Sequence, residues 1–427
     1  MREPLFLLKL LIQSGAARWL PGVQRRLGGG ANFLRYYSNR LLSSPLRQLE
    51  DTAASLQPPG VEVIDLTRGS PSFDVLPSGS TKLPADRRGW PPFAGLSELC
   101  GAVAEKLLRE NDLAFNPAGE ILITAGVLGA VQTVLDAFVN RGDRVVLFDP
   151  SSPLFSLLAG TRQARLHWLP TWMDEGRTRF RMDHLARALR GARLLVLSLP
   201  VNPTGGVIAA EDLEEIAWWA ARYDVLLLSD ESFERYLPDG SAVSIGTLPR
   251  ARQRTLTTGS VSQGYALASA RVGWLAAYRH LLQPCRLTAA LRSPFVPTLS
   301  QQVALAALRS DPGELAPARA EIASRRRYGY ERLRGMELNP TWPAGGYFLW
   351  VPVWERGVSG RRFAECLLHE RQVRVSPGDL FGPSGKGYIR ISCAIDAGRL
   401  QEGLNRLAVC IAITEARSVP QLQPLAA

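Results

Sequence analysis

Cysteine and histidine are scarce in this sequence, and their spacing argues against two kinds of site. The 427 residues include five cysteines and four histidines. The cysteines are scattered, odd in number and form no Cys-x-x-Cys pair, which argues against a disulfide framework and favours a reducing compartment. The histidines show no spacing typical of metal ligands, so we predict no metal site. Together these features predict a cytoplasmic protein.

Lysine is also scarce, although the chain is basic overall. Only four lysines, Lys9, Lys82, Lys106 and Lys386, stand among 50 basic residues, and the formal net charge is +11. Residues 1–42 contribute +6 of this charge, from seven basic residues and one acidic residue. The remaining charge is small for a body of this size, and no segment resembles a nucleic-acid-binding module. We therefore predict no nucleic-acid partner.

Long apolar runs are absent as well. The N-terminal run at residues 5–12 is interrupted by Lys9, and it is much shorter than the roughly 20 residues of a transmembrane helix. No adequate apolar region precedes a small-residue cleavage site, which argues against a secretory signal. The basic segment leaves three interpretations: an organellar transit peptide, an amphipathic helix at a membrane surface, or, as we favour, helices that pack on the body or on a partner subunit.

The body of the chain has the pattern of an α/β fold. With 46% hydrophobic residues, it can bury a large core and form about two domains. Buried strand patterns at residues 145–148, 194–199 and 225–228 alternate with helical stretches such as residues 213–222. This alternation indicates parallel strands, and the ligands of such sheets bind at the carboxyl ends of the strands.

Polar residues and a glycine turn follow apolar runs of this kind. Asn202, Asp230 and Ser260 each come just after a strand pattern, so we expect them to converge on one crevice. Residues 121–130, ILITAGVLGA, read as a strand, a turn at Gly126 and a helix. The free backbone N–H groups and the positive dipole end of such a helix start suit a phosphate.

A longer series of segments carries a family resemblance. In chain order the segments are LTRGSPSF (66–73), GLSEL (95–99), ILITAGVLGA (121–130), Gly142-Asp143, LSLPVNPTG (197–205), LLLSDE (226–231), Ser260 with Arg271 and Gly273, WPAGGYFLWV (342–351), SPG (376–378) and YIRIS (388–392). In this order they resemble the class I/II aminotransferases, the fold-type I enzymes of pyridoxal 5'-phosphate (PLP). The resemblance covers about residues 61–409.

The resemblance implies a fold and a domain division. It implies an α/β fold of fold-type I, with a large domain on a mainly parallel central sheet and a smaller α+β domain. We place a basic helical extension and linker at residues 1–57, the large PLP-binding domain at 58–294, the small domain at 295–410 and a flexible tail at 411–427. The resemblance also implies a homodimer, with a heterodimer as the alternative.

Roles for individual residues follow from the same resemblance. Asp230 would hold the pyridinium nitrogen of PLP protonated, because the charged ring acts as the electron sink. Asn202 would hydrogen-bond the cofactor's 3'-oxygen. On the substrate side, Gly69 belongs to the substrate loop, and Arg390 would clamp the α-carboxylate of an amino acid.

The phosphate of the cofactor would have its own set of residues. Ser260 and Arg271 would bind it, the arginine through a fork that matches two oxygens at once. The backbone amides around Gly126 and Val127 would share that contact. Burying an unpaired guanidinium is costly, so Arg390 within the apolar run YIRIS likewise points to an anionic ligand.

Four departures from the family pattern fall on the same pocket. Gln263 stands where the family has the lysine that carries the cofactor covalently. Phe233, at a cofactor-binding position, replaces a tyrosine that hydrogen-bonds the 3'-oxygen. Ser152 falls where an aromatic ring stacks on the pyridine, and Trp90 replaces a tyrosine that reaches the partner subunit's phosphate. An engineered lysine-to-glutamine exchange would not change the other three positions, so the grouped changes favour natural divergence.

The glutamine removes chemistry that the lysine performs in the family. There the lysine carries the cofactor and, as a free amine, moves a proton between the substrate α-carbon and C4'. A carboxamide is neither a nucleophile nor a base near neutral pH, and general acid–base catalysis contributes roughly 10²–10⁴-fold. We expect PLP, or its amine form pyridoxamine phosphate (PMP), to be held without a covalent bond. Lys82 and Lys386 are the lysines that could reach the pocket rim instead.

Two classes of function remain open. One is an enzyme of amino-acid metabolism that handles amino acids or keto acids, with ordinary transamination strongly impaired. The other is a non-catalytic pseudoenzyme, either a ligand sensor or the inactive partner subunit of a heterodimer. A usable site is favoured by four retained residues, Asp230, Ser260, Arg271 and Arg390. The loss of the lysine, the tyrosine and the stacking ring favours a protein without catalytic activity.

Overall fold

The computed structural model describes residues 62–67, 71, 89–237, 243–293 and 295–418. All of them belong to the second of the two units into which the chain divides, Leu49–Ala427. Gly69, Lys82 and the N-terminal segment 1–57 lie outside the described residues, so the expectations for them stay predictions.

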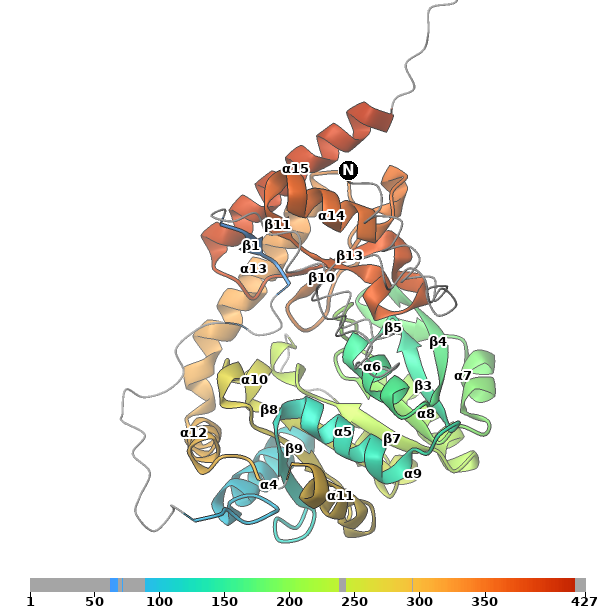
Figure 1. Cartoon of the computed structure of the whole chain (residues 1–427), viewed down its shortest axis with the longest axis vertical. Coiled ribbons are helices and arrows are strands. Elements are labelled where there is room, and N and C mark those ends of the chain that lie inside the picture. Colours follow the sequence, from blue (N-terminus) through green and yellow to red (C-terminus); the bar gives the residue numbers. More distant parts are fainter. Residues whose placement is uncertain (1–61, 68–70, 72–88, 238–242, 294, 419–427) are drawn as a thin grey trace, which may run out of the picture. The chain divides into compact units, whose positions relative to one another are not determined.

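A sheet of eight strands forms the centre of the fold (Figure 1). Its strands lie in the order β2 (Ile121–Thr124), β9 (Gly273–Ala276), β8 (Thr255–Ser260), β7 (Leu226–Asp230), β6 (Leu194–Ser198), β3 (Arg144–Asp149), β4 (Arg165–Asp174) and β5 (Arg177–Phe180). The neighbouring strands from β8 to β4 run parallel, whereas β9, β2 and β5 pair in antiparallel fashion. The predicted α/β fold with a mainly parallel sheet is confirmed.

Helices cover both faces of this sheet, because its central strands are apolar on both faces. Val146 packs with helices on one face, and its neighbour Val145 packs with helices on the other. The helices of the first face are α7 (Met182–Leu189) and α8 (Ala210–Arg222), and those of the second are α5 (Gly126–Phe138), α6 (Pro153–Thr161) and α11 (Arg279–Arg292). Helices α4 (Ser97–Asn111) and α12 (Thr298–Arg309) pack beside β2 and β9, and the short helices α9 (Pro249–Arg252) and α10 (Val261–Gly264) flank β8.

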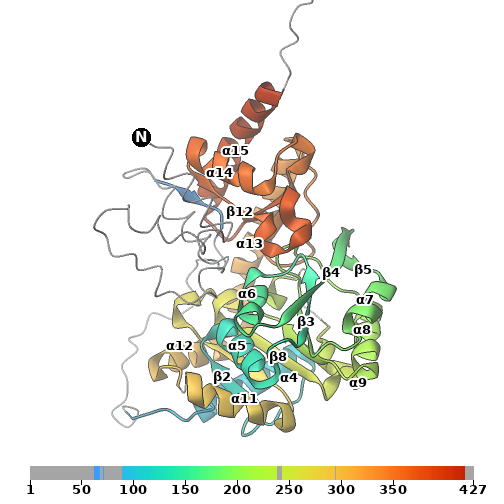
Figure 2. The ribbon, with the colours of Figure 1, turned by 45° about the vertical axis from the view of Figure 1, so that its right-hand side comes forward.

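The C-terminal residues form a second core around a small sheet (Figure 2). Its strands β10 (Phe348–Pro352), β13 (Tyr388–Ser392) and β12 (Ser376–Pro377) are antiparallel. Helices α13 (Ala316–Arg334), α14 (Gly360–Arg371) and α15 (Ala397–Ser418) belong to the same part. Strand β1 (Ile64–Asp65) also returns here and pairs in parallel with β11 (Val373–Arg374).

Two observations differ from the predicted domain boundaries. Ile64 and Leu66 are buried in the C-terminal core rather than in the large domain, because Gly403 on α15 leaves space for their side chains. Helix α15 continues to Ser418, past the predicted boundary at residue 410. Residues 411–418 contain no glycine or proline, so nothing in their composition stops the helix before Pro420.

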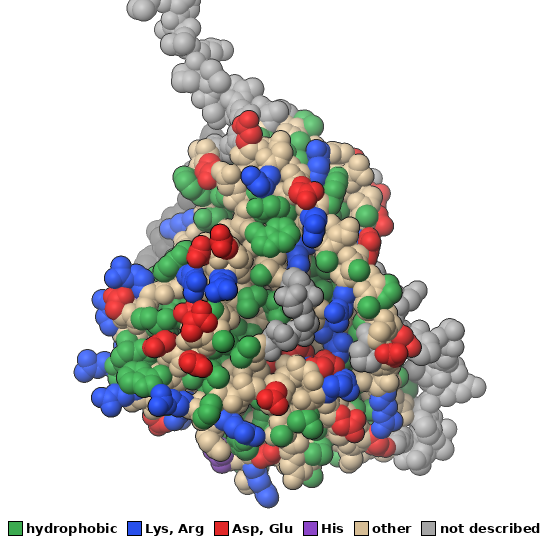
Figure 3. All heavy atoms as spheres, turned by 180° about the vertical axis from the view of Figure 1, so that it is seen from behind, with side chains coloured by type: hydrophobic (Ala, Val, Ile, Leu, Met, Phe, Trp, Pro, Cys, Tyr) green, Lys and Arg blue, Asp and Glu red, His purple; other side chains and the backbone are tan. Residues whose placement is uncertain are grey.

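None of the five cysteines, all of which are described, forms a disulfide. No group of histidine, cysteine and carboxylate side chains in the described part is arranged to hold a metal ion. No helix there combines the length and the apolar character that a membrane crossing requires. On the face shown in Figure 3, basic and acidic side chains are interspersed among apolar ones.

Candidate functional site

Polar residues meet at the carboxyl ends of neighbouring parallel strands. Asp230 ends β7 and Ser260 ends β8, and the register places Asp230 opposite Thr258. Asn202 lies shortly after β6, which is the other neighbour of β7. Because these strands run parallel, their ends open onto one crevice. The structure therefore brings Asn202, Asp230 and Ser260 to the same edge of the sheet.

The N-terminus of helix α5 and Arg271 form a cradle for an anion. A Cβ atom added to Gly126 would lie 2.6 Å from the Arg271 guanidinium, so only glycine lets the arginine approach the helix start. Gly126 also has a φ of +71°, which glycine adopts without strain. Helix α5 has no side-chain cap and no acidic residue in its first turn. Its first N–H groups, including those around Val127, are therefore available to an anion.

Arg271 makes one hydrogen bond of ordinary length and two long contacts with the protein around this cradle. Its Nη1 donates to the Ala268 carbonyl at 3.1 Å and lies 3.5 Å from Ser262 Oγ, and its Nη2 lies 3.5 Å from the Ala125 carbonyl. Arg271 is exposed, and no described carboxylate forms an ion pair with it. A phosphate in the cradle would supply the missing negative charge.

Ser260 and Gln263 bond to each other beside the cradle. The Ser260 hydroxyl donates to Gln263 Oε1 at 2.6 Å, and Ser260 Oγ accepts from the Ser262 amide at 3.3 Å. Gln263 lies on helix α10 and is half-buried. The hydroxyl of Tyr236 donates to the Gln263 carbonyl at 2.7 Å, so the backbone at this position is held in place.

Asp230 is a buried carboxylate without a cationic partner among the described residues. Its Oδ1 accepts hydrogen bonds from the amide of Ser232, at 3.1 Å, and from the Ser232 hydroxyl. Burial raises the pKa of Asp230 to about 6, and these two hydrogen bonds oppose that rise. A cation next to this carboxylate would lower the pKa again. The protonated ring nitrogen of a pyridine is a ligand of the required charge and size.

This raised pKa predicts how the stability of the ligand-free protein depends on pH. The folded protein holds the Asp230 proton up to about pH 6, whereas an unfolded aspartate releases it near pH 4. The contribution of Asp230 to stability is therefore lost as the pH rises through this window. We expect Asp230→Asn to raise the free energy of unfolding at pH 8 by on the order of 2 kcal/mol, and to change it little at pH 4.

Urea unfolding of the native protein and the Asp230→Asn variant between pH 4 and pH 8 measures this difference. Asp112→Asn is the matched control, because Asp112 is exposed and makes no ion pair with a described residue. It should show no such dependence on pH. A native protein that is as stable as Asp230→Asn at pH 8 would contradict the raised pKa.

Arg390 is a buried cation on strand β13 that faces the crevice. Its Nη1 donates to Asn202 Oδ1 at 3.1 Å. Its Nη2 donates to the Thr67 carbonyl at 3.2 Å and to Ser376 Oγ at 3.4 Å. The rings of Phe348 and Phe381 lie 3.9 and 4.8 Å from the guanidinium carbon.

No described carboxylate neutralises Arg390. Its Nε is buried and has no hydrogen-bond partner among the described residues. Burial lowers the pKa of Arg390 to about 10. A buried guanidinium normally has a carboxylate partner, since an unpaired one is costly. The uncompensated positive charge therefore fits the carboxylate of a small ligand.

The family of the chain follows from sequence comparison. The sequence model of the family Aminotransferase class I and II matches residues 61–407. The chain belongs to this family. It is 31% identical over 375 residues to an aspartate aminotransferase of Pyrococcus abyssi, which covers 85% of this chain and 94% of the relative. It is 30% identical over 375 residues to aromatic-amino-acid aminotransferase 2 of Thermococcus litoralis, with 85% and 94% covered.

Solved structures of aminotransferases share the fold. The aromatic aminotransferase from Pyrococcus horikoshii is 28% identical, with a TM-score of 0.75 over 86% of this chain and 99% of that one. The Thermus thermophilus aspartate aminotransferase with maleate is 27% identical, with a TM-score of 0.78 over 88% and 99%. These values support the fold-type I architecture, both for the part with the eight-stranded sheet and for the C-terminal part with the small sheet.

Membership of the aminotransferase family implies PLP as the cofactor. The described residues fit this group. The cradle at Gly126 is a place that a Cβ would fill, and it presents a guanidinium and free amides to a phosphate. Asp230 presents a buried carboxylate that lacks a cation. The two features match the two charged ends of the cofactor.

The three other positions that depart from the family pattern lie in different surroundings. Phe233 is buried in an aromatic cluster, with its ring centre 5.4 Å from that of Tyr347 and 5.7 Å from that of Phe348. Ser152 is buried at the start of helix α6. Trp90 is 85% exposed and stacks on Phe295 with ring centres 5.1 Å apart. The buried ring of Phe233 thus packs in an aromatic cluster and carries no hydroxyl.

Two of the four lysines lie among the described residues. Lys106 is buried on helix α4, and its Nζ bonds to Asn111 at 2.7 Å and to the Glu234 carboxylate. Lys386 is exposed on the short helix η10 (Pro383–Gly387). Lys106 is thus committed to a buried ion-pair network. Lys386 remains the described lysine whose side chain is open to solvent.

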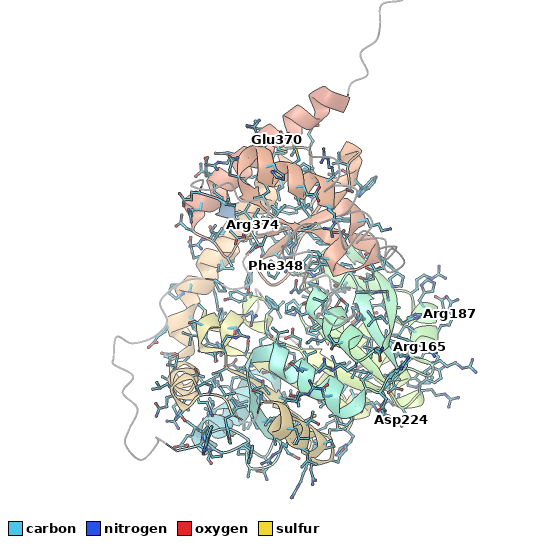
Figure 4. The ribbon with its side chains drawn as sticks, viewed as in Figure 1. Arg165, Arg187, Asp224, Phe348, Glu370 and Arg374 are labelled. Carbon is cyan, nitrogen blue, oxygen red and sulfur yellow. The ribbon has the colours of Figure 1, made fainter. Side chains whose placement is uncertain are left out.

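Several residues around the site were not expected from the sequence. Tyr236 supports Gln263 through its hydroxyl, and its position three residues after Phe233 was the available signal. Ser376 and Phe381 contact Arg390 from separate elements. Ser376 lies in the segment SPG (376–378) of the family resemblance, whereas no local sequence signal indicates Phe381. Phe348, labelled near the middle of Figure 4, lies against the same guanidinium.

Proposed function

We propose that this member of the aminotransferase family holds PLP or PMP without a covalent bond and binds the carboxylate of an amino acid or keto acid beside it. In this proposal Asp230 pairs with the ring nitrogen, Asn202 contacts the 3'-oxygen and Phe233 contacts the ring. When bound, the protonated pyridine ring would supply an electron sink. Ordinary transamination is strongly impaired, because Gln263 stands where the family has its lysine.

The observation that carries the proposal is Arg390. It is a buried cation with a vacant donor and no described carboxylate partner. Its contact with Asn202 ties it to the crevice at the strand ends. A protein that used this pocket only as a structural core would replace such a charge with an apolar side chain at little cost. Gly69, from the substrate loop, completes the proposed carboxylate site and lies outside the described residues.

The phosphate site supports the same proposal. Arg271, the amides around Gly126 and Val127, and the hydroxyl of Ser260 surround the start of helix α5 or lie next to it. Charge-assisted hydrogen bonds from a guanidinium and helix-terminal amides are among the strongest that a protein offers to an anion. They would hold the cofactor in the absence of a covalent link.

Gln263 removes the nucleophile and the base that the family's lysine would supply to the pocket. A carboxamide has no basic nitrogen, so it neither forms the family's covalent link nor moves a proton at the substrate α-carbon. Among the described lysines, Lys106 is held by Asn111 and Glu234. The proton transfer at the substrate α-carbon thus lacks a base at the position of the family's lysine. The enzymatic activity that remains is turnover by a route that uses no lysine.

The second candidate function is a non-catalytic pseudoenzyme. The joint presence of Gln263, Phe233 and Ser152 at this pocket favours it, since each removes a side chain that the family uses. Such a protein would sense a ligand or form the inactive partner subunit of a heterodimer. In the enzymatic case we propose a homodimer.

Titration of the native protein with PLP and with PMP tests the proposed function. Saturable binding should raise the free energy of unfolding by RT ln(1 + [L]/Kd), which is about 2.7 kcal/mol at a ligand concentration of 100 Kd. Thermal unfolding and absorbance measure the two effects. Absence of binding to either ligand would overturn the proposal, whereas binding without turnover of any amino acid would favour the pseudoenzyme.

A further inference from the structure

The hydrogen bond between Ser260 and Gln263 occupies the hydroxyl donor that lies beside the cradle of helix α5 and Arg271. Ser260 carries a single hydroxyl proton, and that proton is directed to Gln263 Oε1 at 2.6 Å. The amide of Ser262 already donates to the same oxygen, so Ser260 acts as acceptor on one side and donor on the other. Arg271 donates one hydrogen bond of ordinary length, at 3.1 Å, and its two other contacts are long, at 3.5 Å.

The position of Gln263 is fixed by its backbone. Tyr236, which is buried, donates its hydroxyl proton to the Gln263 carbonyl at 2.7 Å. Gly264, the next residue, lies against the side chain of Arg235, where an added Cβ would be 2.9 Å from Arg235 Cδ. These two contacts hold helix α10 in place, so the Gln263 side chain stays next to Ser260.

We propose that Gln263 competes with the cofactor's phosphate for the Ser260 hydroxyl proton, and so lowers the affinity of the site for phosphate-bearing ligands. This inference rests on the proposed phosphate site. A phosphate oxygen accepts hydrogen bonds and donates none when it is ionised, so Ser260 serves either Gln263 or the phosphate. Release of the Gln263 bond accompanies every binding event.

Lysine at the same position would not compete in this way. An ammonium group has three donors and no acceptor, so it leaves the Ser260 proton free for the phosphate. The carboxamide oxygen of glutamine is a good acceptor and takes that proton. The residue at position 263 therefore affects phosphate affinity as well as proton transfer.

Two substitutions of opposite effect test the competition. Gln263→Met keeps a side chain of similar length and removes the acceptor, and Gln263→Glu places an anionic acceptor at the same point. A neutral hydrogen bond is typically worth about a fivefold change in affinity. We expect Gln263→Met to bind PLP and inorganic phosphate about fivefold more tightly than the native protein. Gln263→Glu should bind both at least about tenfold more weakly.

Pyridoxal, which lacks the phosphate, distinguishes competition for the Ser260 hydroxyl proton from a change in the room that the substitution leaves for the ligand. Its affinity should be the same for the native protein and for Gln263→Met. In a Ser260→Ala background the difference between glutamine and methionine should vanish for PLP as well, because no hydroxyl proton remains to be contested. Gln401→Met, at an exposed position on α15, is the matched control and should leave all affinities unchanged.

Isothermal calorimetry with the full chain distinguishes the outcomes. If Gln263→Met binds PLP no more tightly than the native protein, the competition is wrong and the proposed function stands. An equal gain for pyridoxal would also overturn the competition. If native protein and variants bind neither PLP nor phosphate, the proposed function fails and the inference fails with it. Binding by Gln263→Met alone would support the competition and show that the native protein does not hold the cofactor.

Discussion

Replacing Gln263 with lysine is expected to yield a coloured protein that binds PLP through a covalent link, which borohydride reduces to a permanent adduct, and that gains transaminase activity. The half-buried side chain lies 2.6 Å from Ser260 at the edge of the phosphate cradle, so a lysine there would reach a bound cofactor. The restored amine supplies both a nucleophile and a proton carrier. We expect a gain of roughly 10²-fold or more in rate over the native protein, the lower end of the range for general acid–base catalysis.

The control for this gain is Gln401→Lys, which adds the same charge at an exposed position of α15. Peptide mapping after borohydride reduction should place the adduct at position 263 in the first variant, with no new adduct in the second. The rate gain stays at the lower end because Phe233 and Ser152 still lack the hydroxyl and the stacking ring. A folded Gln263→Lys variant that stays colourless with PLP would contradict the claim that the pocket is retained.

The second large effect is expected at Arg390. Methionine fills a similar volume and removes the charge, so Arg390→Met should abolish the pairing with a substrate carboxylate. Removal of one partner of a buried charged pair typically costs about 2–5 kcal/mol, so affinity should fall by about 30-fold or more. The ligand-free variant should be more stable than the native protein, by up to about 1 kcal/mol, because an unpaired buried cation is lost.

Calorimetry on PLP-loaded protein, with aspartate, phenylalanine and pyruvate as probes, measures the first effect, and urea unfolding measures the second. Arg165→Met is the matched control, since Arg165 is an exposed arginine on strand β4, labelled in Figure 4. It should change neither quantity. Equal carboxylate affinity in the native protein and Arg390→Met would remove the main support for the proposed function.

Much of the fold could be predicted from local patterns in the sequence. The apolar runs that became β3, β6 and β7 were identified because both faces of a parallel strand are buried, which leaves an unbroken hydrophobic signature. The path of β1 could not be predicted in this way. Its pairing with β11 joins residues more than 300 positions apart, and Ile64 and Leu66 carry no local sign of which core they enter.

The candidate site likewise has features that local sequence patterns predict and features that they do not. The pattern of the sequence predicts Asp230 and Ser260 at one edge, because each ends an apolar run and parallel strands bring their ends together. The contact of Arg390 with Asn202 and the vacancy at its Nε depend on side-chain packing between distant segments. The hydrogen bond from Ser260 to Gln263 spans only three residues, yet it depends on the rotamer of the glutamine, which composition does not determine.

The most direct test of the central claim is the PLP titration of the native protein, read by absorbance and by intact mass after borohydride reduction. The account predicts saturable binding, a rise in thermal stability and no increase in the mass of the reduced protein. The contradicting results are the absence of binding, which would remove the cofactor site, or a covalent increase in mass. An adduct that maps to Lys82 or Lys386 would show that another lysine has taken over the function lost at Gln263.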